Sequence, residues 1–238
     1  MLEEYKNARA IWEENYDSIN LRSDILITER ILGLLGDVRG KKILDLGCGN
    51  GKPARALTER GANVVGVDIS REQINFSLRI EQEKNQGIRY FTSDLLHIEK
   101  IGFPLESFDI IVSLMVHLYL TEADFIKSFS IIAKFLNTAG QFVYGNIHPA
   151  RIFKHHDLDY LKTYLLEEHF PTVSGKIFTT RFYHHPLGMV MNSITDAGLC
   201  VKQVYEPQPN QAELRQYPDL FDITDRLPQY LIINSVKC

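Results

Sequence analysis

From residue 42 onward, short apolar runs alternate with amphipathic stretches, and this alternation restricts the possible folds more than any other feature. Valine, isoleucine and aromatic residues dominate the runs, as in buried strands. The stretches between them carry helix starts, such as Pro53 in a first turn and Ser70 three residues before Gln73. Strands that alternate with helices form parallel sheets through crossover connections, so we predict a doubly wound α/β sheet. The five runs are 42–46, 63–68, 88–94, 108–113 and 140–146.

The sequence on either side of these runs predicts further elements. Residues 2–35 predict two helices, because apolar side chains recur at helical spacing before Gly36. Residues 147–187 break the alternation and are rich in aromatic residues and histidines, and we interpret them as an inserted helical and aromatic lid after strand five. The last elements are a helix at 186–198 and two strands at 199–206 and 229–237. Together with the five runs, these strands predict a mostly parallel sheet of seven strands.

A chain of 238 residues is long enough for one large core and short for two complete domains. We therefore expect a single domain with four consecutive parts. The parts are an N-terminal helical cap at 1–40, a ligand-binding half of the sheet at 41–146, the lid at 147–187, and a C-terminal helix with strands at 188–238.

Composition argues against several classes of protein. A net charge of −4 gives no electrostatic attraction to nucleic acid or to an anionic membrane. No apolar run approaches the roughly 20 residues of a membrane span, and the charged N-terminus lacks the apolar core of a signal peptide. Cys48, Cys200 and Cys238 are too few for a disulfide framework, fit a reducing compartment and lack metal-ligand spacing. We expect a soluble, cytoplasmic protein without a metal site.

The segment from Ile43 to Gly51 contains the motif that carries the chemistry. An apolar strand that includes Asp45 runs into Gly47, Gly49 and Gly51, and a helix follows. Glycines let the chain turn sharply and let its backbone approach a ligand, and the start of the helix offers free N–H groups. The pattern therefore predicts a ligand-binding loop at the end of the first strand.

Two phosphate-binding alternatives fit this loop poorly. A Walker loop needs a glycine where Leu46 stands and a serine or threonine where Pro53 stands. A dinucleotide-binding fold has its third glycine at the position of Lys52, and a carboxylate such as Asp45 would lie unfavourably close to a pyrophosphate. A dinucleotide-binding oxidoreductase stays only as a minor alternative, and any single glycine here could serve a tight turn alone.

The segment ILDLGCGNGKPARAL closely resembles motif I of the class I S-adenosylmethionine (SAM) methyltransferases. SAM carries a sulfonium, an ammonium and a carboxylate but no phosphate, so an acidic residue beside the loop makes electrostatic sense. The resemblance is strong over residues 42–146 and implies a Rossmann-like methyltransferase fold with its last strand antiparallel. Four more segments resemble later motifs of the family in the expected order: 64–70, 92–95, 108–113 and 135–141.

The resemblance implies specific contacts with SAM. Asp68 would accept hydrogen bonds from the ribose hydroxyls, Asp94 would contact the adenine amino group, and the backbone of Leu95 would contact an adenine ring nitrogen. Tyr16, in an aromatic entry segment, would reach the carboxylate of SAM. The full set of expected cofactor-binding residues is Tyr16, Asp45, Gly47, Cys48, Gly49, Gly51, Asp68, Ile69, Asp94, Leu95 and Leu114.

The methyl acceptor should lie where the fourth and fifth strands end, because ligands of open α/β sheets bind at the carboxyl ends of strands. The sequence there lacks the Asn/Asp-Pro-Pro-Tyr/Phe motif of methyltransferases that act on DNA or on protein glutamine. His117 and His148 follow these strands and are our candidates for a general base, with a packed histidine as the alternative for each.

Tyr183 and His184 match a Tyr-His-Arg-Pro-Leu segment of small-molecule relatives, with His185 where arginine is common. We expect these three residues and Tyr119 to line the acceptor site. The chain resembles members of the ubiquinone and menaquinone pathways, which implies methyl transfer to an oxygen or nitrogen of a small, planar or apolar molecule. The cofactor product would be S-adenosylhomocysteine (SAH).

Two alternative functions stay open within the same fold. An RNA or protein methyltransferase would need a basic face or an added recognition module, and the sequence shows neither. A SAM-binding subunit without activity would keep motif I but need no acceptor site. We expect a small-molecule acceptor, no nucleic acid partner, no membrane span, and a monomer or a homodimer.

Overall fold

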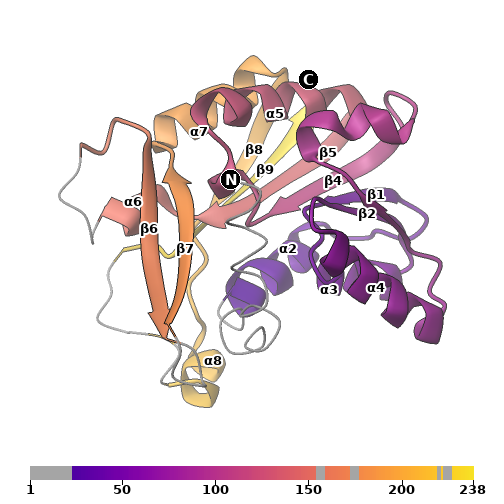
Figure 1. Ribbon diagram of the computed structural model, residues 1–238, viewed down its shortest axis with the longest axis horizontal. Helices are drawn as coiled ribbons and strands as arrows, with labels where there is room; N and C mark the ends of the chain where they lie inside the picture. Colours follow the sequence, from indigo (N-terminus) through magenta and orange to yellow (C-terminus); the bar gives the residue numbers. More distant parts are fainter. Residues whose placement is uncertain (1–22, 154–158, 172–176, 219–220, 222–226) are drawn as a thin grey trace.

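A computed structural model describes residues 23–153, 159–171, 177–218, 221 and 227–238 of the chain. Its centre is a seven-stranded sheet in the order β3-β2-β1-β4-β5-β9-β8 (Figure 1). The strands are β1 (Lys42–Leu46), β2 (Asn63–Asp68), β3 (Arg89–Thr92), β4 (Phe108–Leu114), β5 (Leu136–Ile147), β8 (Leu199–Tyr205) and β9 (Tyr230–Lys237).

The first five strands run parallel. β1 pairs with β2 and β4, β2 pairs with β3, and β4 pairs with β5, all in parallel. β9 runs antiparallel to both of its neighbours, β5 and β8. The predicted doubly wound, seven-stranded sheet with an antiparallel last strand is therefore confirmed. Parallel strands end at the same edge of a sheet, so the loops after β1, β2, β4 and β5 meet there.

Helices cover both faces of the sheet (Figure 1). On one face, Phe129 and Ile194 of α5 and α7 are fully buried in a cluster that also contains Leu44. On the other face, Leu57 of α3 is buried in a cluster that contains Ile43. Since neighbouring residues of β1 serve opposite cores, the strand is apolar without alternation. The helical segments are η1 (Asp24–Thr28), α2 (Glu29–Leu34), α3 (Lys52–Glu59), α4 (Arg71–Lys84), η2 (Leu95–Ile101), η3 (His117–Tyr119), α5 (Glu122–Phe135), α6 (Pro149–Phe153), α7 (Leu187–Asp196) and α8 (Gln211–Gln216).

The helix starts lie where the sequence signals place them. The Ser70 hydroxyl accepts a hydrogen bond from the Gln73 backbone N–H at 3.3 Å, and Thr121 caps α5 in the same way. Gly36 follows α2 with a φ of +66°, which favours glycine. Of the two helices expected over 2–35, the described part shows η1 and α2, and the rest lies outside the described residues. In the described part of the chain, no helix is both long and apolar enough to span a membrane.

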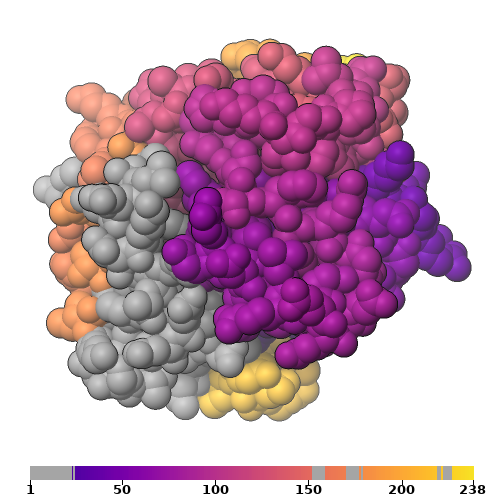
Figure 2. Space-filling model, turned by 45° about the vertical axis from the view of Figure 1, so that its right-hand side comes forward, coloured from indigo at the N-terminus to yellow at the C-terminus, as the bar shows by residue number. Residues whose placement is uncertain are grey.

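The segment after β5 is less helical than expected. Apart from the short α6, its described residues form a two-stranded antiparallel sheet of β6 (Tyr164–Pro171) and β7 (Ile177–His184). In Figure 2 this hairpin, in orange, forms one flank of the molecule. The physical reason is a two-residue periodicity: exposed Leu165 and Glu167 alternate with buried Leu166 along β6. The expectation of a helical lid is therefore corrected to a β-hairpin.

The cysteines also depart from expectation. Cys200 and Cys238 form a disulfide across the ends of β8 and β9, with Cα atoms 5.5 Å apart, while Cys48 is free and buried. Antiparallel pairing brings the start of β8 opposite the end of β9, where Cys200 pairs with Val236. A separation of 38 residues carries no local signal of this contact. The sequence therefore did not predict this single disulfide, and its presence does not support the reducing compartment expected from the cysteine count.

Candidate functional site

The loop after β1 is built on three left-handed glycines. Gly47, Gly49 and Gly51 have φ values of +74°, +51° and +77°, which a residue with a Cβ adopts only with strain. A Cβ on Gly47 would overlap the Val116 side chain, and one on Gly51 would lie 2.5 Å from the Tyr90 hydroxyl. A Cβ on Gly49 would have no atom within 4 Å. Two glycines therefore permit close packing, whereas Gly49 borders open space that a ligand can enter.

Two side chains that the sequence did not reveal hold this loop from outside. Arg55 of α3 donates a hydrogen bond to the Asn50 carbonyl at 2.7 Å. The Ser77 hydroxyl of α4, fully buried, donates to the Gly49 carbonyl at 3.2 Å. Helical spacing after the loop was the available signal for Arg55, whereas Ser77 meets the loop only through tertiary packing.

Asp45 is a buried carboxylate beneath the glycine loop. It is 1% exposed, and its Oδ2 atom has no hydrogen-bond partner within the described structure. Burial, together with the negative charge of Asp68, raises the pKa of Asp45 to about 7. A buried carboxylate oxygen without a partner is unfavourable. The site therefore offers an acceptor that a cationic or N–H-bearing ligand group would satisfy.

Asp68 ends β2 and is oriented by backbone amides. Its Oδ2 accepts the Gly49 N–H at 2.9 Å, and its Oδ1 accepts the Ser70 N–H at 2.8 Å. The side chain is 5% exposed, and Ile69 beside it is half-buried. A carboxylate has about four acceptor positions, and these two amide bonds fix the orientation of the Asp68 carboxylate at the end of β2. The geometry suits a ribose at this edge of the sheet.

The remaining expected cofactor residues are distributed around the same edge. Asp94 caps η2, because its Oδ1 accepts the Leu96 N–H at 2.8 Å, and Leu95 beside it is buried. Leu114 ends β4 and is half-buried, and Cys48 is buried in the loop, where desolvation raises the pKa of its thiol. Tyr16 lies outside the described residues.

His117 lies in the aromatic core. Its ring is fully buried and stacks on Phe129 with centroids 4.8 Å apart, and its Nδ1 is hydrogen-bonded to the Ser113 hydroxyl at 3.3 Å. Desolvation, with a smaller contribution from His185, lowers the pKa of His117 to about 3. This environment favours the alternative of a packed histidine over a general base.

His148 lies at the end of β5, but both ring nitrogens have neighbours in the fold. Its Nδ1 accepts the Ala150 N–H at 3.0 Å, and its Nε2 lies 3.1 Å from Glu206 Oε1. Desolvation lowers the pKa of this 4% exposed side chain, although Glu206 opposes the shift. The contacts assign His148 to the connection between β5, α6 and the end of β8.

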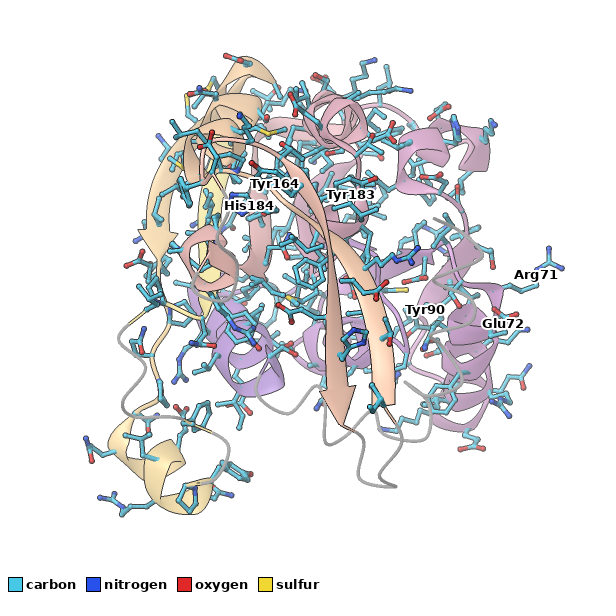
Figure 3. The ribbon with its side chains drawn as sticks, turned by 60° about the vertical axis from the view of Figure 1, so that its left-hand side comes forward. Arg71, Glu72, Tyr90, Tyr164, Tyr183 and His184 are labelled. Carbon is cyan, nitrogen blue, oxygen red and sulfur yellow. A yellow bond between two sulfur atoms is a disulfide. The ribbon has the colours of Figure 1, made fainter. Side chains whose placement is uncertain are left out.

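The predicted wall residues lie around the hairpin. His184 Nε2 contacts the Tyr160 carbonyl at 2.9 Å, and His185 Nε2 contacts the Leu120 carbonyl at 3.1 Å. Desolvation lowers the pKa of both histidines, that of His185 to about 4. Tyr183 is half-buried, and its ring stacks on His185 with centroids 6.1 Å apart. Figure 3 shows His184 and Tyr164 side by side near one end of the hairpin.

The hairpin covers the loops after β4 and β5. Leu166 and Phe182, 7% and 1% exposed, pack on Leu118, with Met115 and Ile147 partly buried against them. This small apolar cluster sits at the strand ends where an acceptor should bind. The hairpin therefore packs on the loop after β4, and its role as a lid over an acceptor stays a prediction.

Tyr144 and Asn146 were not predicted as site residues. The Asn146 amide donates to the Tyr144 hydroxyl at 3.1 Å, and both side chains are buried near the end of β5. Desolvation raises the pKa of Tyr144. Tyr144 and Asn146 are two residues apart on β5 and therefore share one face of the sheet, which the sequence pattern did not single out as part of the site.

Comparison with known proteins identifies the domain. Residues 43–140 match the family model described as a methyltransferase domain, which spans the loop, the acidic residues and β1 to β4. This chain carries a methyltransferase domain. The fold is shared with a Listeria monocytogenes protein assigned to the SAM-dependent methyltransferases, with a TM-score of 0.72 and 22% identity over 88% of this chain and 96% of that one. A SAM-dependent methyltransferase from Mesorhizobium loti gives a TM-score of 0.68 and 23% identity over 87% and 96%.

Relatives by sequence agree with this assignment. An uncharacterized Haemophilus influenzae protein is 28% identical over 230 residues, 90% of this chain and 88% of that protein. A ubiquinone biosynthesis O-methyltransferase from Acinetobacter baylyi is 43% identical over 56 residues, 23% of this chain and 24% of that one. A fatty-acid O-methyltransferase from Mycolicibacterium smegmatis is 31% identical over 116 residues, 48% and 39% of the two chains. These last two matches therefore cover well under half of either relative.

The fold is the one that SAM-dependent methyltransferases share, and residues 43–140 match a methyltransferase domain, as the sequence motifs predicted. Two features of the site fit SAM itself. Gly49 borders open space at the loop, and the buried Oδ2 of Asp45 has no partner there among the described residues. An ammonium or sulfonium satisfies a carboxylate, whereas a phosphate would repel it. The residues present therefore fit SAM better than a dinucleotide.

Proposed function

We propose that this chain transfers a methyl group from SAM to an oxygen or nitrogen of a small, largely apolar molecule. The observation that carries the proposal is the pair of buried carboxylates, Asp45 and Asp68, beside a glycine loop with an open side at Gly49. Such a site suits a ligand that combines a cation with a ribose. The cytoplasmic location and the division into cap, cofactor half and lid remain part of this proposal.

Cofactor binding would use the acidic residue after each of three strands. Asp45 lies near the ammonium of SAM, Asp68 accepts from the ribose hydroxyls, and Asp94 accepts from the adenine amino group. The backbone N–H of Leu95 contacts the adenine ring, and Ile69 and Leu114 pack near the bound cofactor. The free oxygen of Asp45 and the amide-fixed orientation of Asp68 support these roles.

Bound SAM supplies a methyl group that is already activated for displacement, so the chain mainly positions the acceptor and excludes water. The apolar cluster of Leu118, Leu166 and Phe182 under the hairpin supports an acceptor with an apolar body. Two partial relatives are O-methyltransferases by name, which supports an oxygen acceptor. Tyr119, Tyr183, His184 and His185 remain proposed wall residues.

A general base is not assigned to His117 or His148. His117 is closed off in the core, whereas His148 accepts the Ala150 N–H at Nδ1 and places Nε2 3.1 Å from Glu206 Oε1. His117→Asn and His148→Gln are therefore expected to affect folding and the shape of the site more than proton transfer.

Calorimetric titration tests the cofactor assignment. The chain should bind SAM and SAH but not NAD, and Asp68→Asn should weaken SAM binding at least tenfold because the ribose loses a charged acceptor. Asp37→Asn, which changes an exposed carboxylate paired with Arg39, is the matched control and should leave SAM affinity unchanged. Binding of NAD without SAM would contradict the proposal.

A transfer assay separates an enzyme from a silent binder. Small hydroxyl- and amine-bearing acceptors are incubated with the chain and methyl-labelled SAM. Label in a small-molecule product supports the proposal. Tight SAM binding with label only in added RNA or protein would favour the macromolecular alternative, and no transfer to any acceptor would favour a binding subunit.

A further inference from the structure

The hairpin has two distinct faces. Cross-strand pairing places Leu166 opposite Phe182, and both are buried against the loops after β4 and β5. Glu167 lies opposite Arg181 on the other face, where both are exposed and joined by a 2.7 Å ion pair. Paired residues of an antiparallel ladder share one face, and the face changes at each step along the strand. The face of Leu166 and Phe182 is the inner face, and the face of Glu167 and Arg181 is the outer face.

The inner face carries a carboxylate next to this apolar cluster. Glu168 is opposite Thr180 in the ladder and is half-buried, two residues beyond Leu166. The Thr180 side chain is hydrogen-bonded to Tyr119, the last residue of η3. Directly paired side chains lie about 5 Å apart at Cβ. Glu168 therefore lies beside the contact that joins the hairpin to the loop after β4.

The same contact lies within electrostatic reach of the cofactor half. Desolvation raises the pKa of Tyr119 to about 12, and the negative charge of Asp68 adds to the effect. Asp68 is the residue that suits the ribose. Tyr119 is thus in contact with Thr180 of the hairpin and senses the charge of Asp68 at the end of β2.

The charge on the inner face has one sign. The inner-face residues in the described part of the hairpin include no lysine or arginine, and Arg181 is turned outward. A carboxylate in partly apolar surroundings repels a second carboxylate and attracts a hydrogen-bond donor. The described part of the inner face therefore presents a carboxylate without a lysine or arginine beside it on the hairpin.

We propose that Glu168 faces the methyl acceptor and accepts a hydrogen bond from its reacting group, so that the acceptor is an apolar molecule ending in a hydroxyl or an amine and not in a carboxylate. This inference rests on the proposed methyl transfer. A lone pair of the acceptor oxygen or nitrogen forms the new bond to the methyl carbon. The C–S bond breaks, its electron pair stays on sulfur to give SAH, and the proton of the acceptor passes to the Glu168 carboxylate.

Three probes with one apolar body test the substrate class: 4-butylphenol, 4-butylbenzylamine and 4-butylbenzoate. Each is titrated into the full chain saturated with SAH, and each is assayed for label transfer from SAM. The phenol or the amine should bind at least tenfold more tightly than the benzoate, because a hydrogen bond to a charged group replaces a repulsion. Glu168→Gln should remove this difference and lower kcat/KM for the preferred probe about tenfold or more.

The chain offers a matched control one residue away. Glu167→Gln makes the same change on the outer face and should leave the order of binding and kcat/KM unchanged. Equal effects of the two variants, an unchanged order in Glu168→Gln, or no binding of any probe would overturn the inference. Preferred binding of the benzoate would also overturn it and would point to Arg151 of α6, which is half-buried after β5.

Failure of this inference differs from failure of the proposed function. If Glu168→Gln binds SAM as the unmodified chain does but the probes show no preference, only the role of Glu168 is wrong. If the unmodified chain does not bind SAM, the methyltransferase proposal itself fails. SAM titration of both Glu168→Gln and Glu167→Gln also shows whether each variant is folded.

Discussion

At the scale of single residues, the buried acids and the buried histidines differ in where their side chains point. Asp45 and Asp68 lie buried at the ends of β1 and β2 beside the glycine loop, and local sequence predicted their position because each follows an apolar run. His117 and His148 also follow strands, yet their rings turn into the fold. Sequence gives the place of a residue along a strand. It does not give the direction of a side chain in the loop beyond the strand.

The ionised carboxylate of Asp45 should lower the stability of the folded chain and strengthen SAM binding. Its pKa in the folded chain is raised from 3.8 to about 7, so the stability linked to its protonated form is present at low pH and lost as the pH rises through 7. Without cofactor, Asp45→Asn should therefore raise the free energy of unfolding at pH 8 by on the order of 1–3 kcal/mol, with a smaller effect at pH 5. SAM affinity should fall at least tenfold at pH 8.

Urea unfolding at the two pH values and calorimetric SAM titration measure these effects. The comparison between pH 5 and pH 8 is the internal control, because the change in side-chain shape is the same at both. If Asp45→Asn changes the free energy of unfolding by the same amount at pH 8 and at pH 5, the charge of Asp45 does not destabilise the folded chain.

At the scale of elements, the glycine loop and the hairpin differ in how much the sequence revealed. The loop was predictable because glycine spacing, an apolar strand and a following helix all lie within a few residues. The hairpin was missed because aromatic richness hid a two-residue alternation between Leu166 and Glu167. The Tyr119–Thr180 contact joins elements about 60 residues apart and has no local signal.

Alanine substitutions at Gly47 and Gly49 should have different effects on stability and on SAM affinity. Gly47→Ala should lose stability and SAM affinity together, since its Cβ would overlap Val116 at a φ of +74°. Gly49→Ala should lose about 1–2 kcal/mol of stability from its left-handed backbone but most of its SAM affinity, because the Cβ enters the open side. Thermal melts and SAM titration distinguish the two.

Gly188→Ala in α7 serves as the control for both variants. A Cβ there would meet no atom within 4 Å, and alanine favours a helix. It should leave SAM affinity unchanged. Equal SAM affinity of Gly49→Ala and the unmodified chain would show that the cofactor does not approach at Gly49.

At the scale of the whole molecule, the Cys200–Cys238 disulfide closes the far edge of the sheet. It links the start of β8 to the end of the chain beyond β9, across 38 residues of sequence. A cross-link of this length restricts the unfolded chain more than the folded one. By chain-entropy reasoning it contributes roughly 3–4 kcal/mol.

Cys238→Ser should therefore lower the melting temperature under non-reducing conditions. In the presence of a reductant, the variant and the unmodified chain should melt together. SAM affinity should be the same for both, because β8 lies at the sheet edge opposite β2 and β3. A melting temperature of the unmodified chain that does not change with reductant would show that the bond does not form in solution.

Sequence by itself determined the parallel core, the glycine loop and the acids at the strand ends, because each depends on residues that are close together along the chain. Periodicity and turn chemistry act over a few residues and can be read directly. Only the tertiary structure decided that the histidines pack inward, that the lid is a hairpin, that Cys200 meets Cys238, and that Glu168 shares the inner face. These features depend on contacts between distant segments, whose burial and direction are set by the packing of the whole sheet.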